Sequence, residues 1–131
     1  MTMTRTILLV LAVAACSKAG EPDKAAPAAS PRDTVIAAWT SAKLVPSKLT
    51  ATPVAFAKDC QSGTVEGVDV LLCGFATPAE AKAAEEPGLV WIGGATGASQ
   101  AHGAVLIVVA DRKKADPNGR TINRLMKLAP N

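Results

Sequence analysis

The residue types that could do chemistry gather in one glycine-rich stretch, GGATGASQAHG, at residues 93–103. It holds Ser99 and the chain's only histidine, His102, which suggests a nucleophile and a general base. A serine hydrolase also needs an oriented base and an oxyanion hole, and the sequence has no Gly-x-Ser-x-Gly elbow. A phosphate-binding loop needs Gly-Lys-Ser/Thr before a helix, whereas a strand is predicted here. We therefore predict a flexible connection between two strands.

Acidic residues offer a second candidate for acid–base chemistry. Glu85 and Glu86, with Asp69 or Glu66, would supply paired carboxylates. Glu85 and Glu86 are adjacent at the predicted C-terminus of a helix, so they point in different directions and oppose the helix dipole. We therefore predict solvated surface residues, and we predict no catalytic residue, no cofactor and no metal site.

Basic residues form the best-supported surface in the sequence. The last predicted helix carries cations at i, i+4 and i+7, and DRKK at 111–114 ends the preceding strand. The candidate contact residues are Arg112, Lys113, Lys114, Arg120, Arg124 and Lys127. They are suited to anionic lipid headgroups or an acidic envelope protein. The alternative, which we favour, is the solvated side of an amphipathic helix.

Nucleic acid is not predicted as a partner. The formal net charge of the full chain is +3, and aromatic residues make up 3% of it, with no tyrosine. A mild charge without aromatic side chains that could stack on bases does not fit a nucleic-acid surface.

Two cysteines, Cys60 and Cys73, predict one disulfide, because an even count at short spacing is typical of exported domains. Such a loop closure contributes roughly 3 kcal/mol to stability. A metal site is the alternative, but the chain has no Cys-x-x-Cys and His102 is distant in sequence. A tight hairpin at Gln61-Ser62-Gly63 would not place the cysteines opposite each other, so we expect the bond to pin a looser loop to a strand.

The remaining pattern predicts a domain at residues 31–131 with the order α-β-β-α-β-β-α. Helices are expected at 30–44, 77–86 and 116–128, and strands at 50–59, 64–75, 89–94 and 104–111. Ser30, Thr77 and Asp116 are the expected N-caps, each followed by proline. Trp39 and Trp91 are expected in the core. The fold class is α+β: a two-layer sandwich with a mostly antiparallel sheet of about four strands, covered on one face by three helices.

The N-terminal residues predict where the protein is located. Arg5 precedes the apolar run TILLVLAVAA at 6–15, which is too short to span a bilayer and is typical of an export signal. Val13-Ala14-Ala15-Cys16 resembles the lipobox of bacterial lipoproteins, in which the cysteine becomes the lipidated N-terminus. Residues 1–15 are then the signal peptide, and 16–30 are the lipidated cysteine and a disordered tether, rich in Ala, Pro and Lys.

This resemblance implies an exported protein held in the membrane by lipid on Cys16. Ser17 stands where the family's inner-membrane retention signal would have Asp, so we expect the outer membrane, facing the periplasm. The expected role is a non-catalytic binding or accessory module of the cell envelope. The alternative is a small envelope enzyme or metal-dependent protein that uses the 93–103 loop, with His102 as its reactive group.

Overall fold

The computed structural model describes residues 30–131, so the predicted signal peptide, Cys16 and nearly all of the tether lie outside the described residues. The elements are α1 (Pro31–Ser41), β1 (Thr50–Ala51), β2 (Asp59–Val65), β3 (Val68–Gly74), α2 (Pro78–Ala83), α3 (Glu85–Ile92), β4 (Thr96–His102), β5 (Val105–Asp111) and α4 (Arg120–Leu128). Among these residues, no helix has the length and apolar character needed to cross a membrane.

The strands form one antiparallel sheet in the order β1-β2-β3-β5-β4. Two hairpins, β2–β3 and β4–β5, join through the β3–β5 pair at the centre. The first hairpin turns at Glu66 and Gly67, whose φ angles of 51° and 84° match the two-residue turn that suits the twist of paired strands. The α+β class and the mostly antiparallel sheet are thus confirmed, with five strands instead of four.

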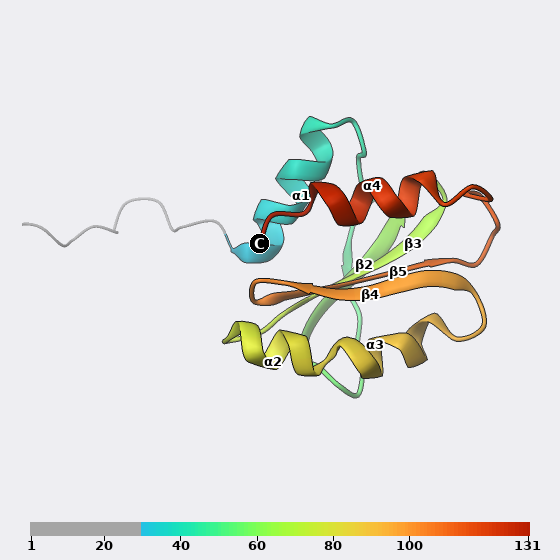
Figure 1. Cartoon of the computed structure of the whole chain (residues 1–131). Coiled ribbons are helices and arrows are strands. Elements are labelled where there is room, and N and C mark those ends of the chain that lie inside the picture. The colour runs from blue at the N-terminus through green and yellow to red at the C-terminus, as the bar shows by residue number, and fades with distance from the viewer. Residues whose placement is uncertain (1–29) are drawn as a thin grey trace, which may run out of the picture.

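Helices cover both faces of this sheet, so the expectation of two layers was wrong. In Figure 1, α1 and α4 lie on one side of the strands, and α2 and α3 lie on the other. The buried residues accordingly form two separate apolar clusters. The reason lies in β5, whose residues are all buried: a strand that is apolar on both sides needs a layer of helices on each.

The cluster beneath α1 and α4 is closed. Val35 and Trp39 of α1 and Leu125 of α4 pack on alternate residues of the central strands. The indole Nε1 of Trp39 donates a hydrogen bond of 2.8 Å to the Leu125 carbonyl, so its one polar atom is satisfied. The predicted apolar face of the last helix is confirmed, because Ala129 is buried in the same cluster.

The cluster beneath α2 and α3 uses the opposite residues of the same strands. Leu71 and Cys73 of β3 face Leu106 and Val108 of β5, and Ile92 packs on them from α3. The two helices contact β4 and β5. The loop at 52–58 packs against this cluster through partly buried apolar side chains, beside the disulfide.

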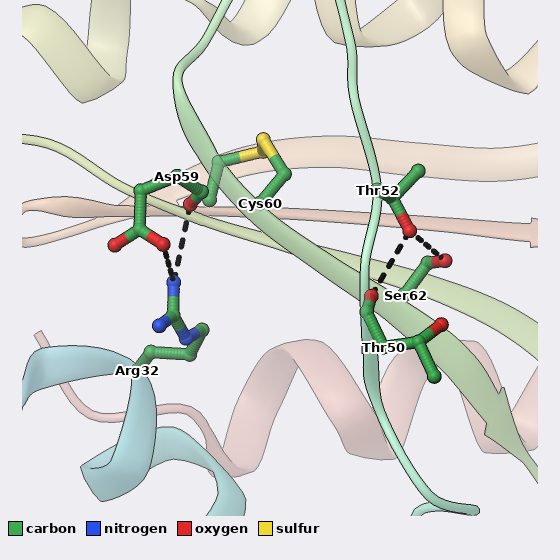
Figure 2. The surroundings of a disulfide bond; sticks show 7 residues. Arg32, Thr50, Thr52, Asp59, Cys60 and Ser62 are labelled. Carbon is green, nitrogen blue, oxygen red and sulfur yellow. Dashed lines mark hydrogen bonds and ion pairs between the residues drawn. A yellow bond between two sulfur atoms is a disulfide. The ribbon is translucent and has the colours of Figure 1, made fainter.

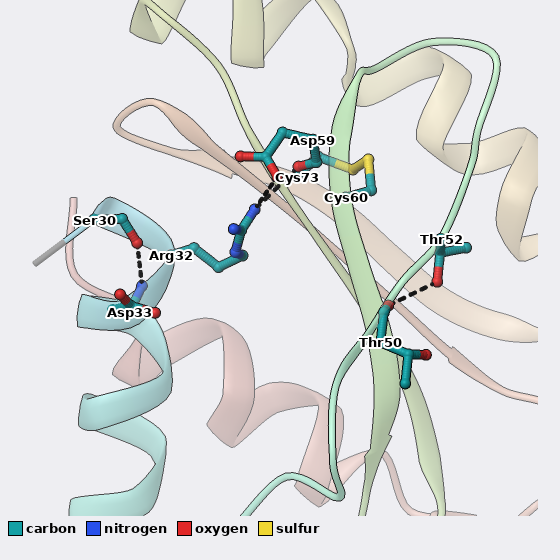
Figure 3. Close-up of polar contacts among 8 residues, drawn as sticks. All are labelled: Ser30, Arg32, Asp33, Thr50, Thr52, Asp59, Cys60 and Cys73. Atoms are coloured by element: carbon teal, nitrogen blue, oxygen red, sulfur yellow. Dashed lines mark hydrogen bonds and ion pairs between the residues drawn. A yellow bond between two sulfur atoms is a disulfide. The ribbon is translucent and has the colours of Figure 1, made fainter.

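The first two predicted helix starts are confirmed. Asp33 N donates to Ser30 Oγ at 3.1 Å, and Glu80 N donates to Thr77 Oγ1 at 3.2 Å. Figure 3 shows the first of these contacts. The third differs: α4 begins after Gly119, which has a left-handed φ of 71°. Asp116 still caps this helix from a distance, because its carboxylate accepts hydrogen bonds from two backbone N–H groups of the first turn.

The segment after α2 corrects the prediction most strongly. We expected Pro87-Gly88 to end a helix and 89–94 to form a strand, but α3 runs through both. Pro87 is tolerated because the first turn of a helix needs no N–H donors. Gly88 lets the helix approach the sheet: a Cβ there would collide with Ser99 Oγ.

Two further segments were assigned wrongly. The predicted loop at 95–103 contains the edge strand β4, whose small polar residues gave no strand pattern. The predicted strand at 50–59 is mostly a loop, since only Thr50–Ala51 pairs with β2. The predicted strand at 64–75 spans the hairpin turn, so its first residues belong to β2.

The disulfide is present between Cys60 and Cys73, but its expected geometry was wrong. The two residues are direct partners across the β2–β3 hairpin, with a Cα–Cα distance of 4.1 Å. The hairpin turns at 66–67 rather than at 61–63, which brings them opposite each other. Figure 2 shows the bond beside the Thr50–Thr52 segment, where Thr52 contacts Ser62. In Figure 3, Arg32 of α1 pairs with Asp59 next to Cys60, at 2.9 Å.

Candidate binding surface around Trp91

Ser99 and His102 lie on opposite faces of the sheet, so they do not form a nucleophile–base pair. Ser99 Oγ donates to the Glu85 carbonyl at 2.7 Å, on the side of α2 and α3. His102 lines a small hollow with Pro31 and Thr34 of α1, on the other side. Side chains alternate along a strand, so residues three apart point in opposite directions.

Glu85 has a structural role at the edge of the sheet. Its carboxylate Oε2 accepts a hydrogen bond of 2.8 Å from the Ala101 N–H, which faces away from β5. Glu85 and Glu86 start α3 instead of ending a helix, so the helix dipole stabilises them. The prediction that they oppose the dipole was wrong. Glu85 blunts the open edge of β4.

His102 is only 8% exposed, and neither ring nitrogen has a hydrogen-bond partner among the described residues. Burial lowers the pKa of its imidazole. The Ala129 backbone and the Asn131 side chain, which approach the ring without full hydrogen-bond geometry, and the Glu85 carboxylate oppose this in part. The ring is therefore held in a site that favours its neutral form. Within residues 30–131, no three His, Cys, Asp or Glu side chains lie close enough to hold a metal ion.

The other carboxylates are also engaged in the fold. Asp111 and Asp116 are buried, and both oxygens of each accept backbone N–H groups of the 115–122 segment. Asp69 pairs with Arg112 at 3.0 Å. Glu66 accepts a long hydrogen bond, 3.4 Å, from the Thr121 hydroxyl. The expected capping role of Asp116 is thus met from a distance, whereas the role of Asp111 was not predicted because it depends on the fold of the 112–116 loop.

The six basic residues predicted as one surface are divided between the two faces. Arg120, Arg124 and Lys127 lie exposed on α4, where Arg124 also donates to the Ala42 carbonyl at 3.1 Å. Arg112 follows β5 and points to the other side of the sheet, towards α3. Lys113 and Lys114 are exposed in the loop between them.

Arg112 forms a cap on Trp91, a residue predicted to be core but only half-buried here. The guanidinium carbon lies 4.2 Å from the centre of the indole, a favourable cation–π arrangement. The same guanidinium donates to the Trp91 carbonyl and to Asp69 Oδ2. Arg112 therefore covers one face of the Trp91 ring and binds its carbonyl, while part of the ring remains accessible.

Three hollows in the surface meet at Trp91. The first is an apolar groove between the 53–56 loop and α3. The second is polar and lies over β2, where Lys48 and the hydroxyls of Thr50, Ser62 and Thr64 line it beside Arg112. The third lies between the end of α3 and the 112–119 loop, with Lys114 in its wall. We call these three hollows together the Trp91 surface.

The apolar groove is the most unusual part of this surface. It has a volume of about 470 Å³, and its walls are Pro53, Val54, Ala55, Phe56, Pro87, Val90 and Trp91. Val90 is 80% exposed, and Leu89 next to it is 53% exposed. Adjacent exposed apolar side chains on a folded domain are typical of an interaction site.

Comparisons with known proteins found no relative: no protein-family model, no curated protein and no solved structure matches this chain. The candidate site therefore rests on its own geometry. Sequence reasoning missed it because α3 was taken for a strand, which would have placed Val90 and Trp91 on opposite sides. Read as a helix, the spacing of Pro87, Val90 and Trp91 at i, i+3 and i+4 identifies one apolar face.

Proposed function

We propose that this protein is an exported lipoprotein, held in the membrane by lipid on Cys16, that serves as a non-catalytic binding module of the cell envelope. Its Trp91 surface is the contact site for a protein partner. The predicted location is the outer membrane, with the domain on the periplasmic side. A tether of the predicted length has an end-to-end distance of about 20 Å, which keeps the domain near the bilayer.

The observation that carries this proposal is the exposed groove at Val90 and Trp91. Burying an aliphatic side chain such as Val90 is worth about 1.5–3 kcal/mol, so leaving it 80% exposed forgoes stabilisation that a partner could supply. The residues considered for catalysis make structural contacts instead, which also supports a binding role. Ser99 and Glu85 hold α3 to β4.

A second contact follows from α4. Arg120, Arg124 and Lys127 are exposed on the layer opposite α3, so a partner at the Trp91 surface would leave them accessible. We propose a contact with anionic headgroups as the alternative to the solvated side of an amphipathic helix, which we favour, and charge reversal distinguishes the two. Reversing the three charges is expected to weaken surface contact at low salt and to change little at high salt. No change at either salt concentration would identify a merely solvated face.

The test uses the lipidated protein in intact cells, with a photoreactive residue in place of Val90 and, as a matched control, in place of Val45. Val45 is also an exposed valine, at 62%, but it lies outside the Trp91 surface. We expect a stoichiometric protein adduct from position 90 and none from position 45. Equal or absent adducts at the two positions would contradict the proposed site.

Anchoring is tested separately by metabolic labelling with palmitate. The wild-type chain should incorporate label and sediment with membranes, whereas Cys16→Ser should do neither. Labelling that persists in Cys16→Ser would place the lipid elsewhere or show that the lipobox resemblance is misleading.

A further inference from the structure

From the Trp91 surface we infer the chemistry of its partner: an acidic segment of another protein that seats a large apolar side chain in the groove and places carboxylates against Lys48 and Lys114. This inference rests on the proposed function, which states only that the surface binds a protein. The segment is extended, because the apolar groove and the two charged hollows lie on different sides of Trp91.

The apolar component follows from the groove. All seven residues that line it are apolar, and its volume falls within the range of pockets that bury small ligands. Prolines on both walls, Pro53 and Pro87, restrict the backbone there. A groove with stiff walls loses little conformational entropy when it is filled, which favours one inserted side chain.

The charge of the segment follows from the two other hollows. Their cations are Lys48, Arg112 and Lys114, and their acids are Asp69, Asp111 and Asp116. Every one of these acids is already engaged, by Arg112 or by backbone N–H groups. Within residues 30–131, neither Lys48 nor Lys114 forms an ion pair. The hollows hold equal numbers of cations and acids, but Asp111 and Asp116 are buried and Asp69 is paired with Arg112. The exposed, unpaired charges that a partner would meet are therefore the two lysines, and complementarity favours carboxylates.

Arg112 links the apolar groove to the two charged hollows, because it stacks on Trp91 and lines both hollows. It is fixed by Asp69 and by the Trp91 carbonyl, and it stacks on the indole, so the ring and the cation are already in place before a partner arrives. Tryptophan and arginine are also the residues most often found at the energetic centre of protein interfaces.

A membrane is the less favourable occupant. Side chains that insert into a bilayer protrude from a convex face, and their cations reach the headgroups on flexible stems. Here the apolar residues line a concave groove, and Arg112 is fixed by its contacts on Asp69 and Trp91. The concave groove and the fixed Arg112 favour a protein segment over a bilayer, and the unpaired Lys48 and Lys114 do not distinguish the two.

The experiment uses the mature lipidated protein in phosphatidylcholine vesicles and the fluorescence of its two tryptophans. Trp39 is fully buried, so quenching by acrylamide reports Trp91. The probe is a short synthetic peptide with one phenylalanine among alternating leucine and glutamate residues. We expect saturable protection of Trp91 by this peptide, and none by the same peptide with lysine in place of glutamate.

Two variants separate the components. Val90→Gln should weaken peptide binding about tenfold, because it replaces apolar contact by a neutral amide, and Lys114→Gln should weaken it about threefold at low salt. Their matched controls are Val45→Gln and Lys43→Gln, exposed positions that line none of the three hollows and should bind as wild type does. Equal binding of the two peptides, or equal effects of site and control variants, would overturn the inference.

The cellular crosslink from position 90 distinguishes this failure from failure of the proposed function. Mass spectrometry of the adduct identifies the partner segment. An acidic segment with a large apolar residue supports the inference. A basic or uniformly polar segment overturns it, although the binding module would stand. Adducts to lipid alone, with Trp91 protected by added phosphatidylglycerol, overturn both.

Discussion

The two tryptophans of this domain occupy the two faces of one sheet and have opposite environments. Trp39 is fully buried between α1, α4 and the sheet, and its N–H is bonded to the Leu125 carbonyl. Trp91 is half-buried at the end of α3, with Arg112 stacked on its ring and exposed Val90 beside it. Trp39 lies in a fully covered core, whereas Trp91 lies at the solvent-exposed edge of the core on the other face.

The difference separates the main core of this small domain from its candidate binding surface. The face under α1 and α4 contains the larger cluster, including Val70, Leu72, Ile107 and Val109 of the two central strands. On the other face, α2 and α3 cover β4 and β5, so polar residues of β2 remain accessible beside Trp91. The larger buried cluster lies on one side of the sheet, and the accessible apolar and polar residues around Trp91 lie on the other.

The largest loss of stability is expected from truncating Trp39, on the face covered by α1 and α4. Trp39→Ala is expected to reduce the free energy of unfolding by about 3–5 kcal/mol, because it leaves a cavity in a packed core. Urea denaturation followed by circular dichroism measures it. If the variant does not fold, Trp39→Phe is the substitute, expected to cost about 1–3 kcal/mol by leaving the Leu125 carbonyl unpaired. A loss below about 1 kcal/mol for Trp39→Ala would contradict a closed core.

The disulfide belongs to the open face, where its removal should have the next largest effect. Cys60 and Cys73 lie in the cluster under α2 and α3, and their bond closes a loop with a sequence separation of 13. The double variant Cys60→Ala/Cys73→Ala is expected to lose about 3 kcal/mol of stability in urea. Dithiothreitol should destabilise the wild type by a similar amount and leave the double variant unchanged. Equal responses of both proteins to the reductant would contradict this prediction.

Local signals in the sequence predicted the elements that depend on local chemistry. Ser30 and Thr77 mark helix starts through their own side chains, and the apolar run at 104–111 identified the central strand β5. The cysteine pair was also identified, because an exported chain with two close cysteines has few other uses for them. None of these features requires knowledge of distant contacts.

The errors arose where tertiary contacts decide the structure. Val90, Trp91 and Ile92 have high strand propensity, but Gly88 and Ser99 dock this segment on the sheet as a helix. β4 is polar and small, yet it pairs along its length with β5. The proposed binding surface depends on this docking, so the strand prediction at 89–94 concealed the apolar groove. Arg112 was grouped with the cations of α4 because it precedes them in the chain, whereas its side chain contacts Trp91 on the other face of the sheet.

A substitution at Trp91, on the partly exposed face, is expected to cost less stability than the same substitution at Trp39. Trp91→Ala is expected to cost only about 1–2 kcal/mol of stability, because the ring is partly exposed and loses mainly one cation–π contact and part of its burial. Chemical denaturation of this variant beside Trp39→Ala gives the contrast directly. Peptide binding, followed with a fluorophore on the peptide, should be lost in Trp91→Ala and retained in Trp39→Phe. Similar stability losses for the two alanine variants would show that the faces do not differ.

The smallest expected effect concerns His102, whose buried ring nitrogens form no hydrogen bond of good geometry with the described residues. Burial lowers its folded-state pKa below the unfolded value of 6.5, so the neutral ring is favoured in the fold. The stability that depends on this neutral form is fully present above about pH 6.5, and it is lost as the pH falls through the folded-state pKa.

His102→Gln removes the titration and keeps a polar side chain, so its stability should change less than that of the wild type over this window. Thermal unfolding of both proteins between pH 7.5 and 5 measures the difference. The charged groups around position 102, including Glu85, are the same in both proteins and therefore cancel in the comparison. Parallel pH profiles would mean that His102 is solvated in solution, and the closed face would then be open at that end. Enzymatic use of His102 would instead appear as lost biological function in a His102→Ala variant that still folds and binds.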